Sequence, residues 1–573
     1  VRLSIGLHTK SCYKTSACDG LFSFEPILTL RLKPSYLLVV VHCNGITDRD
    51  MFGKSDDLKD MRKWRVWKLK LIDARLYFVS IFVGLLTGLV AVPYHYLLQL
   101  FFNTRRDFFD SHPHWYWHIP IFLSLWGILL FVMWLVKKMP LITGGGIPQT
   151  RGVINGRISY KHPFIELVSK FVGGVLALSA GLSLGREGPS VQIGSYVGCL
   201  VSKWGRVLAG ERKQLLAAGA GAGLAAAFAA PLASSLLVIE SIERFDAPKT
   251  AITTLLAGVV AGGVASMIFP INPYFQIDAI SPGLTFFSQV KLFLLLAAVI
   301  SVSGKIYSVI TVWFKRLYPA IKHPAYVKML YLLFIAYLIS LTEVNLTGGG
   351  EQFLLGQAMH ADTHIMWIVG MMILHFVFSV LSFSSGLPGG SFIPTLVTGG
   401  LIGQIVALIL VRQGIIGYEN ISYVMLICMS AFLVAVIRTP LTAIVLITEI
   451  TGHLEVFYPS IVVGGLTYYF TEMLQIQPFN VTLYDDMINS PEFQEEKRYT
   501  LSVEVMSGSY FDGKTVNEIQ LPERCEIINI HRDRKDIPPA KQKLVPGDQV
   551  QIEMDAQDIE KLYEPLVSMA NIY

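Results

Sequence analysis

The stretch Leu184–Gly194, LGREGPSVQIG, places an arginine and a glutamate side by side in one of the most apolar regions of the chain. Glycines flank the two charged residues, and Pro189 follows them. Proline fits the first turn of a helix because the backbone donor that it lacks would have no partner there, and glycine lets the backbone approach another group closely. The stretch therefore predicts a helix that begins inside the apolar region, with Arg186 and Glu187 at its start.

Composition assigns the chain to a broad class. Its 573 residues are 53% hydrophobic and only 16% charged, with a mean hydropathy of +0.51, which indicates an integral membrane protein. The net charge of +5 is small, so we expect no nucleic-acid partner. The sequence contains no HExxH or GxSxG motif, and its six cysteines lack metal-ligand spacing. We therefore expect neither an enzyme nor a bound cofactor or metal.

Apolar segments run through the middle of the chain, and several are shorter than the roughly 20 residues that a helix needs to cross a hydrocarbon core. We expect these short helices to end at mid-depth, around a pathway. The segments are residues 71–102, 117–137, 163–181, 188–203, 212–229, 231–243, 249–269, 289–317, 327–341, 365–381, 391–411, 419–437, 440–451 and 458–474. The run Met61–Lys70 combines five cations with two tryptophans, which is typical of a cytoplasmic interface and predicts a cytoplasmic amino end.

The chain divides by composition. Residues 1–60 form a predicted N-terminal segment; residues 1–50 have mixed composition, and we interpret them either as a disordered cytoplasmic tail or as sequence upstream of a start at Met51. After Phe479 short apolar runs alternate with charged residues and proline, which predicts strands around a short helix. The predicted domains are a membrane domain at 61–487 with halves at about 71–269 and 289–474, a linker at 488–500 and a soluble α+β domain at 501–573.

Two parts of the membrane domain repeat one another. AAFAAPLASSLLVIE ends at Glu240 and LVAVIRTPLTAIVLITE ends at Glu449, and each glutamate stands nine residues after the proline that opens its helix. A glycine-rich break ending in proline lies upstream of each, GREGP in the first half and GLPGGSFIP in the second. Paired interrupted segments in two halves of a chain indicate a transport site near the membrane midplane.

The glycine breaks suit an anion. A helix that begins at mid-depth directs unpaired backbone N–H groups, with a partial charge of roughly +0.5, at whatever occupies the break. GGGIP at Gly144–Pro148, GREGP at Gly185–Pro189 and GGSFIP at Gly389–Pro394 share this pattern. We expect the three helix starts to surround one dehydrated anion without a fixed positive charge, so that the ion can leave again.

The ionisable residues allow two interpretations. Glu187 is expected to occupy the anion's place when charged and to vacate it when protonated, although a simple cap at a helix start is the alternative. Arg186 does not exchange protons in the physiological range, so a structural role is at least as plausible as a role in the anion path. Glu240 and Glu449 end apolar helices, where a hydrogen bond between helices is as plausible as a role in proton transfer.

These motifs resemble the signatures of the CLC family of chloride channels and chloride/proton exchangers, in the right order from about Arg65 to Met487. The resemblance implies an all-α polytopic membrane fold with broken and tilted helices in two inverted halves, and a homodimer with one anion path in each subunit. It implies that chloride and protons are the transported partners and that Glu187 is the gate. The implied anion-binding residues are Gly144, Gly145, Gly146, Ile147, Arg186, Glu187, Gly188, Ser391, Phe392 and Tyr484, the last with its hydroxyl closing the inner side of the site.

Two positions depart from the family pattern. Gly145 stands where the family usually carries a serine, which puts anion selectivity, chloride against nitrate, in doubt. Ser241 stands where exchangers commonly carry a glutamate that takes protons from the cytoplasm, and serine does not titrate in the physiological range. The sequence thus favours a chloride/proton exchanger and leaves a passive voltage- or pH-gated chloride channel as the alternative, with Glu240 or Glu243 as other proton acceptors.

The tail also carries a resemblance. FDGKTVNEIQLP and LVPGDQVQI, within Ser509–Met554, resemble the C-terminal lobe of regulators of potassium conductance, the TrkA-C type. This implies a cytoplasmic regulatory domain that binds an unidentified small ligand or dimerises. Paired regulatory modules of eukaryotic relatives are not evident, which favours a bacterial plasma-membrane protein with both termini in the cytoplasm and membrane lipid around it.

Overall fold

The computed structural model describes most of the chain. The described residues are 28–29, 40–41, 57–111, 114–205, 207, 209–242, 247–268, 275, 277, 279–358, 364–490, 498–532, 535–539, 543–555 and 559–570. Residues up to Leu76 form a unit of their own, in which β1 (Leu28–Thr29) pairs antiparallel with β2 (Val40–Val41). The predicted segment 1–60 lies mostly outside the described residues, as do Glu243 and residues 491–497 of the predicted linker.

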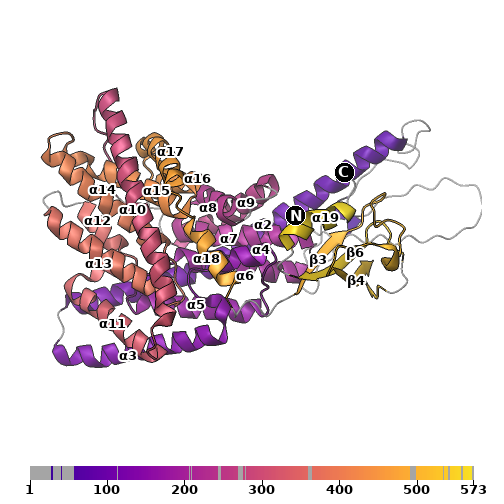
Figure 1. Ribbon diagram of the computed structural model, residues 1–573, viewed down its shortest axis with the longest axis horizontal. Helices are drawn as coiled ribbons and strands as arrows, with labels where there is room; N and C mark the ends of the chain where they lie inside the picture. Colours follow the sequence, from indigo (N-terminus) through magenta and orange to yellow (C-terminus); the bar gives the residue numbers. More distant parts are fainter. Residues whose placement is uncertain are drawn as a thin grey trace, which may run out of the picture. The chain divides into compact units, whose positions relative to one another are not determined.

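The membrane part is all helical (Figure 1). Its first group of elements is α2 (Asp57–Asp110), α3 (Trp115–Lys138), the 3₁₀ turn η1 (Pro140–Ile142), α4 (Ile147–Ile154), α5 (Pro163–Ser179), α6 (Glu187–Gly205), α7 (Ala209–Phe228), α8 (Pro231–Leu237), the π turn η2 (Val238–Ile242) and α9 (Ala247–Ile268). The second group is α10 (Phe286–Ala320), α11 (Ala325–Thr342), η3 (Val344–Leu346), α12 (Glu351–Ala358), α13 (Ile365–Ser384), α14 (Phe392–Arg412), η4 (Tyr418–Asn420), α15 (Ile421–Ile437), α16 (Pro440–Thr451), η5 (Leu454–Val456), α17 (Phe457–Met473) and α18 (Phe479–Ile488).

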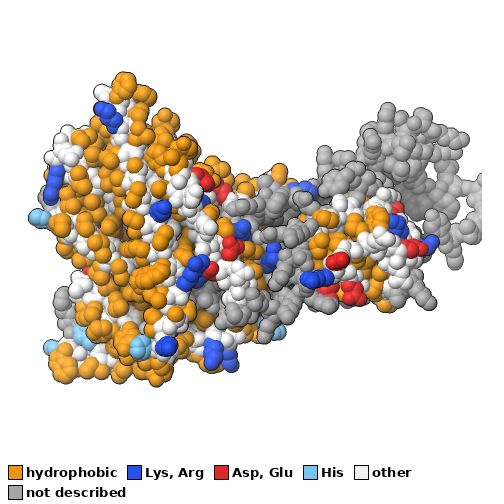
Figure 2. Space-filling view, in the orientation of Figure 1, with side chains coloured by type: hydrophobic (Ala, Val, Ile, Leu, Met, Phe, Trp, Pro, Cys, Tyr) orange, Lys and Arg blue, Asp and Glu red, His pale blue; other side chains and the backbone are white. Residues whose placement is uncertain are grey.

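Eight helices of the described residues are long and apolar enough to cross a membrane. Helix α3 buries only Leu129 and Val132 among its own residues, whereas all residues of α15 are buried, so α3 lies on the outside of the helical part and α15 forms the centre of the second half. Hydrophobic side chains cover most of one face of the helical part, and the charged ones there are few and scattered (Figure 2). The prediction of a polytopic all-α membrane protein is confirmed.

The two groups of elements repeat one another in order and length. The order 3₁₀ turn, eight-residue helix, long helix, glycine break, long helix occurs from η1 to α6 and again from η3 to α14. Each eight-residue helix follows a Thr-Gly-Gly-Gly run, Thr143–Gly146 in the first half and Thr347–Gly350 in the second. Our sequence analysis missed the second of these runs, which the identical letters TGGG would have revealed.

Reciprocal hydrogen bonds join the two halves. Gly185 N–H donates to Gly390 C=O over 2.6 Å, and Gly390 N–H donates to Gly185 C=O over 2.7 Å. These glycines are equivalent in the repeat, since each precedes its helix-opening proline by four residues. When two halves are related by a two-fold axis, equivalent residues make the same contact in both directions, as these two glycines do. The predicted inverted halves are therefore confirmed in their contacts as well as in their order.

The described part of the chain after Arg498 forms a small α+β domain. Its sheet has the order β3-β6-β4-β5, with all neighbours antiparallel. The strands are β3 (Arg498–Glu504), β4 (Glu526–Arg532), β5 (Lys535–Ile537) and β6 (Gln549–Asp555), and the helices are the 3₁₀ turn η6 (Val516–Glu518) and α19 (Ile559–Ala570). Helix α19 packs beside β3 (Figure 1) and adds Leu566 and Ala570 to the apolar core. The α+β prediction is confirmed, with β3 beginning inside the predicted linker.

Candidate functional site

The three predicted glycine breaks meet at one place. Gly144 N–H donates to Gly386 C=O over 3.2 Å, and Gly389 N–H donates to Gly144 C=O over 3.1 Å. The Gly185–Gly390 pair ties the second break to the third. These breaks lie more than 40 residues apart in sequence, and their backbones nonetheless pair directly, so α4, α6 and α14 all begin from one small region.

Glycine is required in these breaks for two reasons. Gly144 and Gly146 have φ angles of 61° and 91°, in the left-handed region that side chains disfavour. Gly188 has an ordinary φ, but a methyl group on it would lie 2.9 Å from the backbone C and Cα of Gly145 and closer still to the carbonyl oxygen. The second break therefore packs backbone against backbone on the first.

A cavity of about 320 Å³ lies against these helix starts. Of the residues that the sequence predicted for the anion site, six line this cavity: Gly144, Gly145, Ile147, Gly188, Ser391 and Phe392. Ile147 and Phe392 are the first residues of α4 and α14, and Gly188 is the second residue of α6. Three helix N-termini thus face one cavity, as we expect if their unpaired backbone N–H groups are to bind an anion.

Glu187 does not line the cavity but lies directly beside the same helix starts. Its side chain is fully buried, and its carboxylate lies near the backbone N–H groups of Glu187 itself and of Ile393, in the first turn of α14. A methyl group on Gly185 would touch Oε2 of Glu187 and would lie 3.3 Å from the backbone nitrogen of Ile393, so the carboxylate and the first turn of α14 converge on one small space. This placement suits a carboxylate that occupies an anion's place.

Arg186 points to a different neighbourhood. Its Nη2 lies 3.8 Å from Oε1 of Glu351, the first residue of α12, and it is absent from the cavity lining. Gly146 also lies away from the cavity, where a methyl group would meet the side chain of Gln192. The structure therefore separates Arg186 and Gly146 from the residues that face the cavity.

Glu240 and Glu449 cap each other's repeat helix. Glu240 accepts hydrogen bonds from Leu441 N–H at 3.0 Å, and from Thr442 through both N–H at 2.8 Å and Oγ1 at 2.6 Å. Glu449 accepts from Leu232 N–H at 3.1 Å and from the N–H of the next residue at 2.8 Å. Of the two interpretations of these glutamates, the structure favours the hydrogen bond between helices.

Ser241 lies in the π turn η2 that follows α8, and its side chain is buried. The equivalent helix α16 stays α-helical past Glu449, so the π turn is a departure from the repeat. Single π turns inside helices frequently occur at functional sites. Turn η2 packs against α4, the helix of the first glycine break.

Helix α18 brings a different residue to the cavity than the sequence predicted. Tyr484 is absent from the lining, and its ring lies 4.9 Å from the guanidinium carbon of Arg151. Asn480, one turn earlier on α18, lines the cavity, and its Nδ2 is buried without a hydrogen-bond partner among the described residues. The structure therefore brings Asn480, and not the predicted Tyr484, to the cavity lining. The two residues are one helical turn apart on α18, and Asn480 is in the first turn, beside the helix start at Phe479.

Lys170 is a second residue that sequence reasoning missed. It is fully buried on α5, and its Nζ donates to Ile142 C=O over 2.8 Å and to Gly144 C=O over 2.6 Å. The side chain ties down the first glycine break and places an amine behind it. A lysine inside the apolar segment 163–181 was the available signal.

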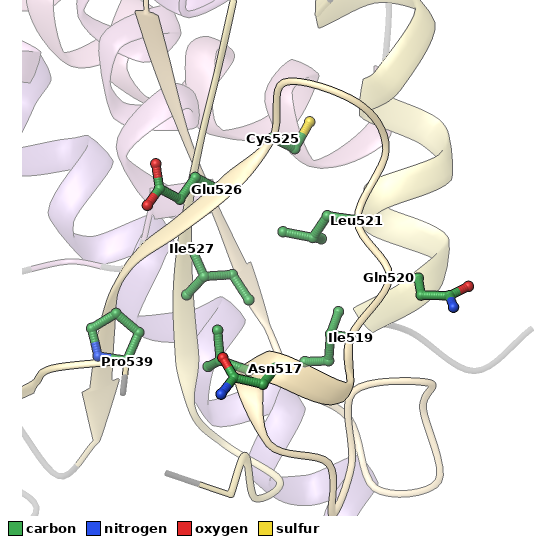
Figure 3. A pocket seen from close by; sticks show the side chains of 9 residues that line it. Asn517, Ile519, Gln520, Leu521, Cys525, Glu526, Ile527 and Pro539 are labelled. Carbon is green, nitrogen blue, oxygen red and sulfur yellow. The ribbon is translucent and has the colours of Figure 1, made fainter. Parts of the chain in front are cut away.

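The C-terminal domain has a surface pocket of about 760 Å³ between η6 and β4. Ile519, Leu521 and Ile527 point toward one another across it, whereas Gln520 and Glu526 point outward (Figure 3). Both apolar and polar side chains therefore line the pocket. The predicted small ligand stays a prediction.

These features define a polytopic membrane protein of two inverted halves whose interrupted helices direct their N-termini into one cavity. The chain belongs to the voltage-gated chloride channel (CLC) family, because the family profile described as Voltage gated chloride channel matches residues 127–472, more than half of the chain. The TrkA-C domain profile matches residues 501–567.

Several relatives resemble the chain over most of its length. The H⁺/Cl⁻ exchange transporter ClcA of Vibrio cholerae serotype O1 is 32% identical over 452 residues, which cover 73% of this chain and 91% of that protein. The protein of the same name from Salmonella schwarzengrund is 30% identical over 436 residues, covering 73% and 90%. These relatives are transporters, so the chain is a membrane transport protein and not an enzyme.

Solved structures agree with this assignment. A slow cyanobacterial Cl⁻/H⁺ antiporter has a TM-score of 0.67 at 26% identity, covering 73% of this chain and 99% of that one. A CLC-type fluoride/proton antiporter, at 21% identity and a TM-score of 0.57, covers 70% and 96% and shares the fold.

Proposed function

We propose that the chain exchanges chloride for protons and that both ions reach Glu187. The observation that carries the proposal is the fully buried Glu187 carboxylate, which lies beside the helix starts and near the backbone N–H of Ile393 in the first turn of α14. A charged carboxylate competes with chloride for the backbone donors, and protonation removes the competitor. The names of the relatives, H⁺/Cl⁻ exchange transporters, support the same conclusion.

In this proposal chloride enters through the cavity and meets backbone donors at Gly145, Gly188 and Phe392. Gly145 supplies no hydroxyl, so any neutral side-chain donor must come from other residues of the cavity lining, such as Asn480. Lys170 holds the first break in place through the carbonyls of Ile142 and Gly144 and does not line the cavity. The partial positive charges of three helix starts favour a monovalent anion.

A passive chloride channel of the same fold is the second candidate. The observation that favours it is the pair Glu240 and Ser241: the first is occupied as a helix cap and the second does not titrate, so neither supplies a free proton acceptor on that helix. An exchanger would then deliver protons to Glu187 through water in the cavity.

We also propose the wider arrangement that the family suggests. The membrane domain at 61–487 would form a homodimer in a bacterial plasma membrane, with both termini in the cytoplasm. The domain at 501–573 would regulate transport from the cytoplasmic side, through a ligand in its surface pocket or through dimerisation. The TrkA-C match over residues 501–567 supports the regulatory assignment.

Paired chloride and proton fluxes in liposomes test the function. We expect a proton gradient to displace the reversal potential from the chloride Nernst value, and we expect Glu187→Gln to abolish the displacement while chloride still passes. A wild-type reversal potential at the chloride Nernst value would establish the channel instead. The same assay with nitrate in place of chloride measures the effect of Gly145 on selectivity.

A further inference from the structure

A buried carboxylate outside the cavity lies in the first turns of α5. Glu166 is 3% exposed and is absent from the cavity lining. Its Oε1 accepts a hydrogen bond from the backbone N–H of His162 over 3.1 Å, and the backbone N–H of Lys161 also lies near the carboxylate. A carboxylate has about four acceptor positions, so two backbone donors leave room for a proton or a water molecule.

Two buried tyrosines lie close to this carboxylate. The charge of Glu166 acts on the hydroxyls of both Tyr160 and Tyr196, and the centroids of the two rings lie 4.3 Å apart. The Tyr160 hydroxyl donates to Ser195 Oγ over 3.4 Å and also lies 3.5 Å from Thr150 Oγ1. All four of these hydroxyl side chains are buried. Glu166 therefore lies beside a group of hydroxyls, each of which can accept one proton and release another.

Gln192 connects this group of hydroxyls to the first glycine break. Its Nε2 donates to the Tyr196 hydroxyl over 3.0 Å, and its Oε1 is buried without a hydrogen-bond partner among the described residues. A methyl group on Gly146 would lie 2.5 Å from that Oε1, so the amide stands directly behind the break, and the next residue, Ile147, lines the cavity. A buried acceptor without a donor is costly, so we expect a water molecule on Oε1.

The other end of the chain of polar groups lies at a basic side of the membrane domain. Lys203, near the end of α6, acts electrostatically on Glu166. The turn between α4 and α5 carries Arg157 and Lys161, and short loops rich in lysine and arginine face the cytoplasm. Lys203 follows Glu187 on the same helix by 203 − 187 = 16 residues, which is a rise of about 24 Å. The chain of polar groups therefore covers most of the depth between the cytoplasm and the gate.

We propose that Glu166 takes up protons from the cytoplasm and that Tyr160 and Tyr196 pass them toward Glu187. The inference rests on the proposed chloride/proton exchange and supplies the proton acceptor that α8 and η2 lack. The Glu166 carboxylate takes a proton from cytoplasmic water, and a tyrosine hydroxyl then accepts that proton on its oxygen and releases its own. Water beside the first break receives the released proton, which reaches Glu187 through water in the cavity. One proton enters and one leaves at each hydroxyl, so none is left charged. Of the described residues, the charged and titratable side chains that face Glu166 are the two tyrosines, His162 and Lys203.

Paired chloride and proton fluxes in liposomes test this route. Glu166→Gln keeps an acceptor for the His162 N–H but does not titrate, so we expect proton flux to fall about 100-fold while the melting temperature stays at the wild-type value. Chloride should still pass, because Glu187 still exchanges protons with the opposite side of the membrane. Tyr196→Phe keeps the ring and removes the hydroxyl, so it should also lower proton flux. Glu449→Gln is the matched control, because Glu449 likewise accepts backbone N–H groups at a helix start but belongs to the other half, and it should leave proton flux unchanged.

Two results would overturn the inference and leave the proposed function intact. The first is proton flux at the wild-type level in Glu166→Gln. The second is a loss of proton flux in Glu449→Gln as large as that in Glu166→Gln, because the effect would then follow from weakened helix starts and not from the tyrosine hydroxyls.

Infrared difference spectra provide a readout that does not depend on transport. A step to lower pH on the full chain in lipid vesicles should produce a carboxylic-acid C=O band that is lost in Glu166→Gln and shifted in Tyr196→Phe. Identical spectra of the wild type and Glu166→Gln would overturn the inference. If the wild type shows no proton coupling at all, the proposed function fails, and this measurement still decides whether Glu166 takes up protons.

Discussion

Gly188→Ala tests whether the glycine breaks pack as the structure shows. The new methyl group would lie 2.9 Å from the C and Cα atoms of Gly145 and closer still to its carbonyl oxygen, where ordinary contact begins at 3.4 Å, so the two breaks must separate by more than 3.4 − 2.9 = 0.5 Å. Both partners are backbone, and no side chain is available to move. Overpacking of this kind costs about 3 kcal/mol, and the helix preference of alanine returns about 1 kcal/mol. The net loss of stability is then about 2 kcal/mol.

The functional effect should be larger than the loss of stability. The separation moves the donors of α6 relative to those of α4, and misplacement by about half an ångström is expected to lower anion flux about tenfold. Chloride flux from liposomes and thermal melting of the purified protein measure both effects. Gly263→Ala is the matched control, because nothing lies within 4 Å of its added methyl group, and it should leave flux unchanged. Wild-type flux and melting in Gly188→Ala would refute the reasoning.

Four further outcomes are expected. In the wild type chloride flux should rise as pH falls, because protonation removes the charge of Glu187, whereas Glu187→Gln should give high flux at every pH; a pH-dependent Glu187→Gln variant would contradict the gate. Glu240→Ala should lower the melting temperature more than Glu449→Ala does. The Glu240 substitution removes three hydrogen bonds to a carboxylate and the Glu449 substitution removes two, with about 1.5 kcal/mol expected for each bond. A change in proton stoichiometry without loss of stability would instead make Glu240 a proton acceptor. Lys170→Met should leave two buried carbonyls unpaired and weaken anion binding several-fold, measured by calorimetry with chloride; unchanged affinity would show that its charge does not act on the site. Asp548→Asn should unfold the C-terminal domain locally, because Asp548 is fully buried and accepts two hydrogen bonds from Arg532. Hydrogen exchange on the full chain measures the local unfolding, and unchanged protection of the domain would contradict the prediction.

Local sequence was sufficient for several features of the site. Glycine and proline act on the backbone where they stand, so the starts of α6 and α14 were predicted to within a residue or two from GREGP and GGSFIP. The same local rule applies to TGGG at Thr347–Gly350, but no proline follows this run as Pro148 follows the first, so the second run lacks the glycine–proline pattern of the other breaks.

Side-chain partners across the repeat required the tertiary structure. Which role Glu240 takes depends on a helix start about 200 residues away, and no local pattern distinguishes a cap from a proton acceptor. The same reason explains why Asn480 and not Tyr484 lines the cavity: the two are one turn apart along α18, and packing against the other helices decides which turn reaches the cavity.

The sequence by itself determined that this protein is a membrane protein of two repeated halves with glycine-broken helices, because hydrophobic length and backbone freedom are properties of short stretches. Only the tertiary structure decided that the breaks pair through Gly185 and Gly390 and that Lys170 holds the first break. These contacts join segments far apart in the chain, and their geometry follows from how whole helices pack.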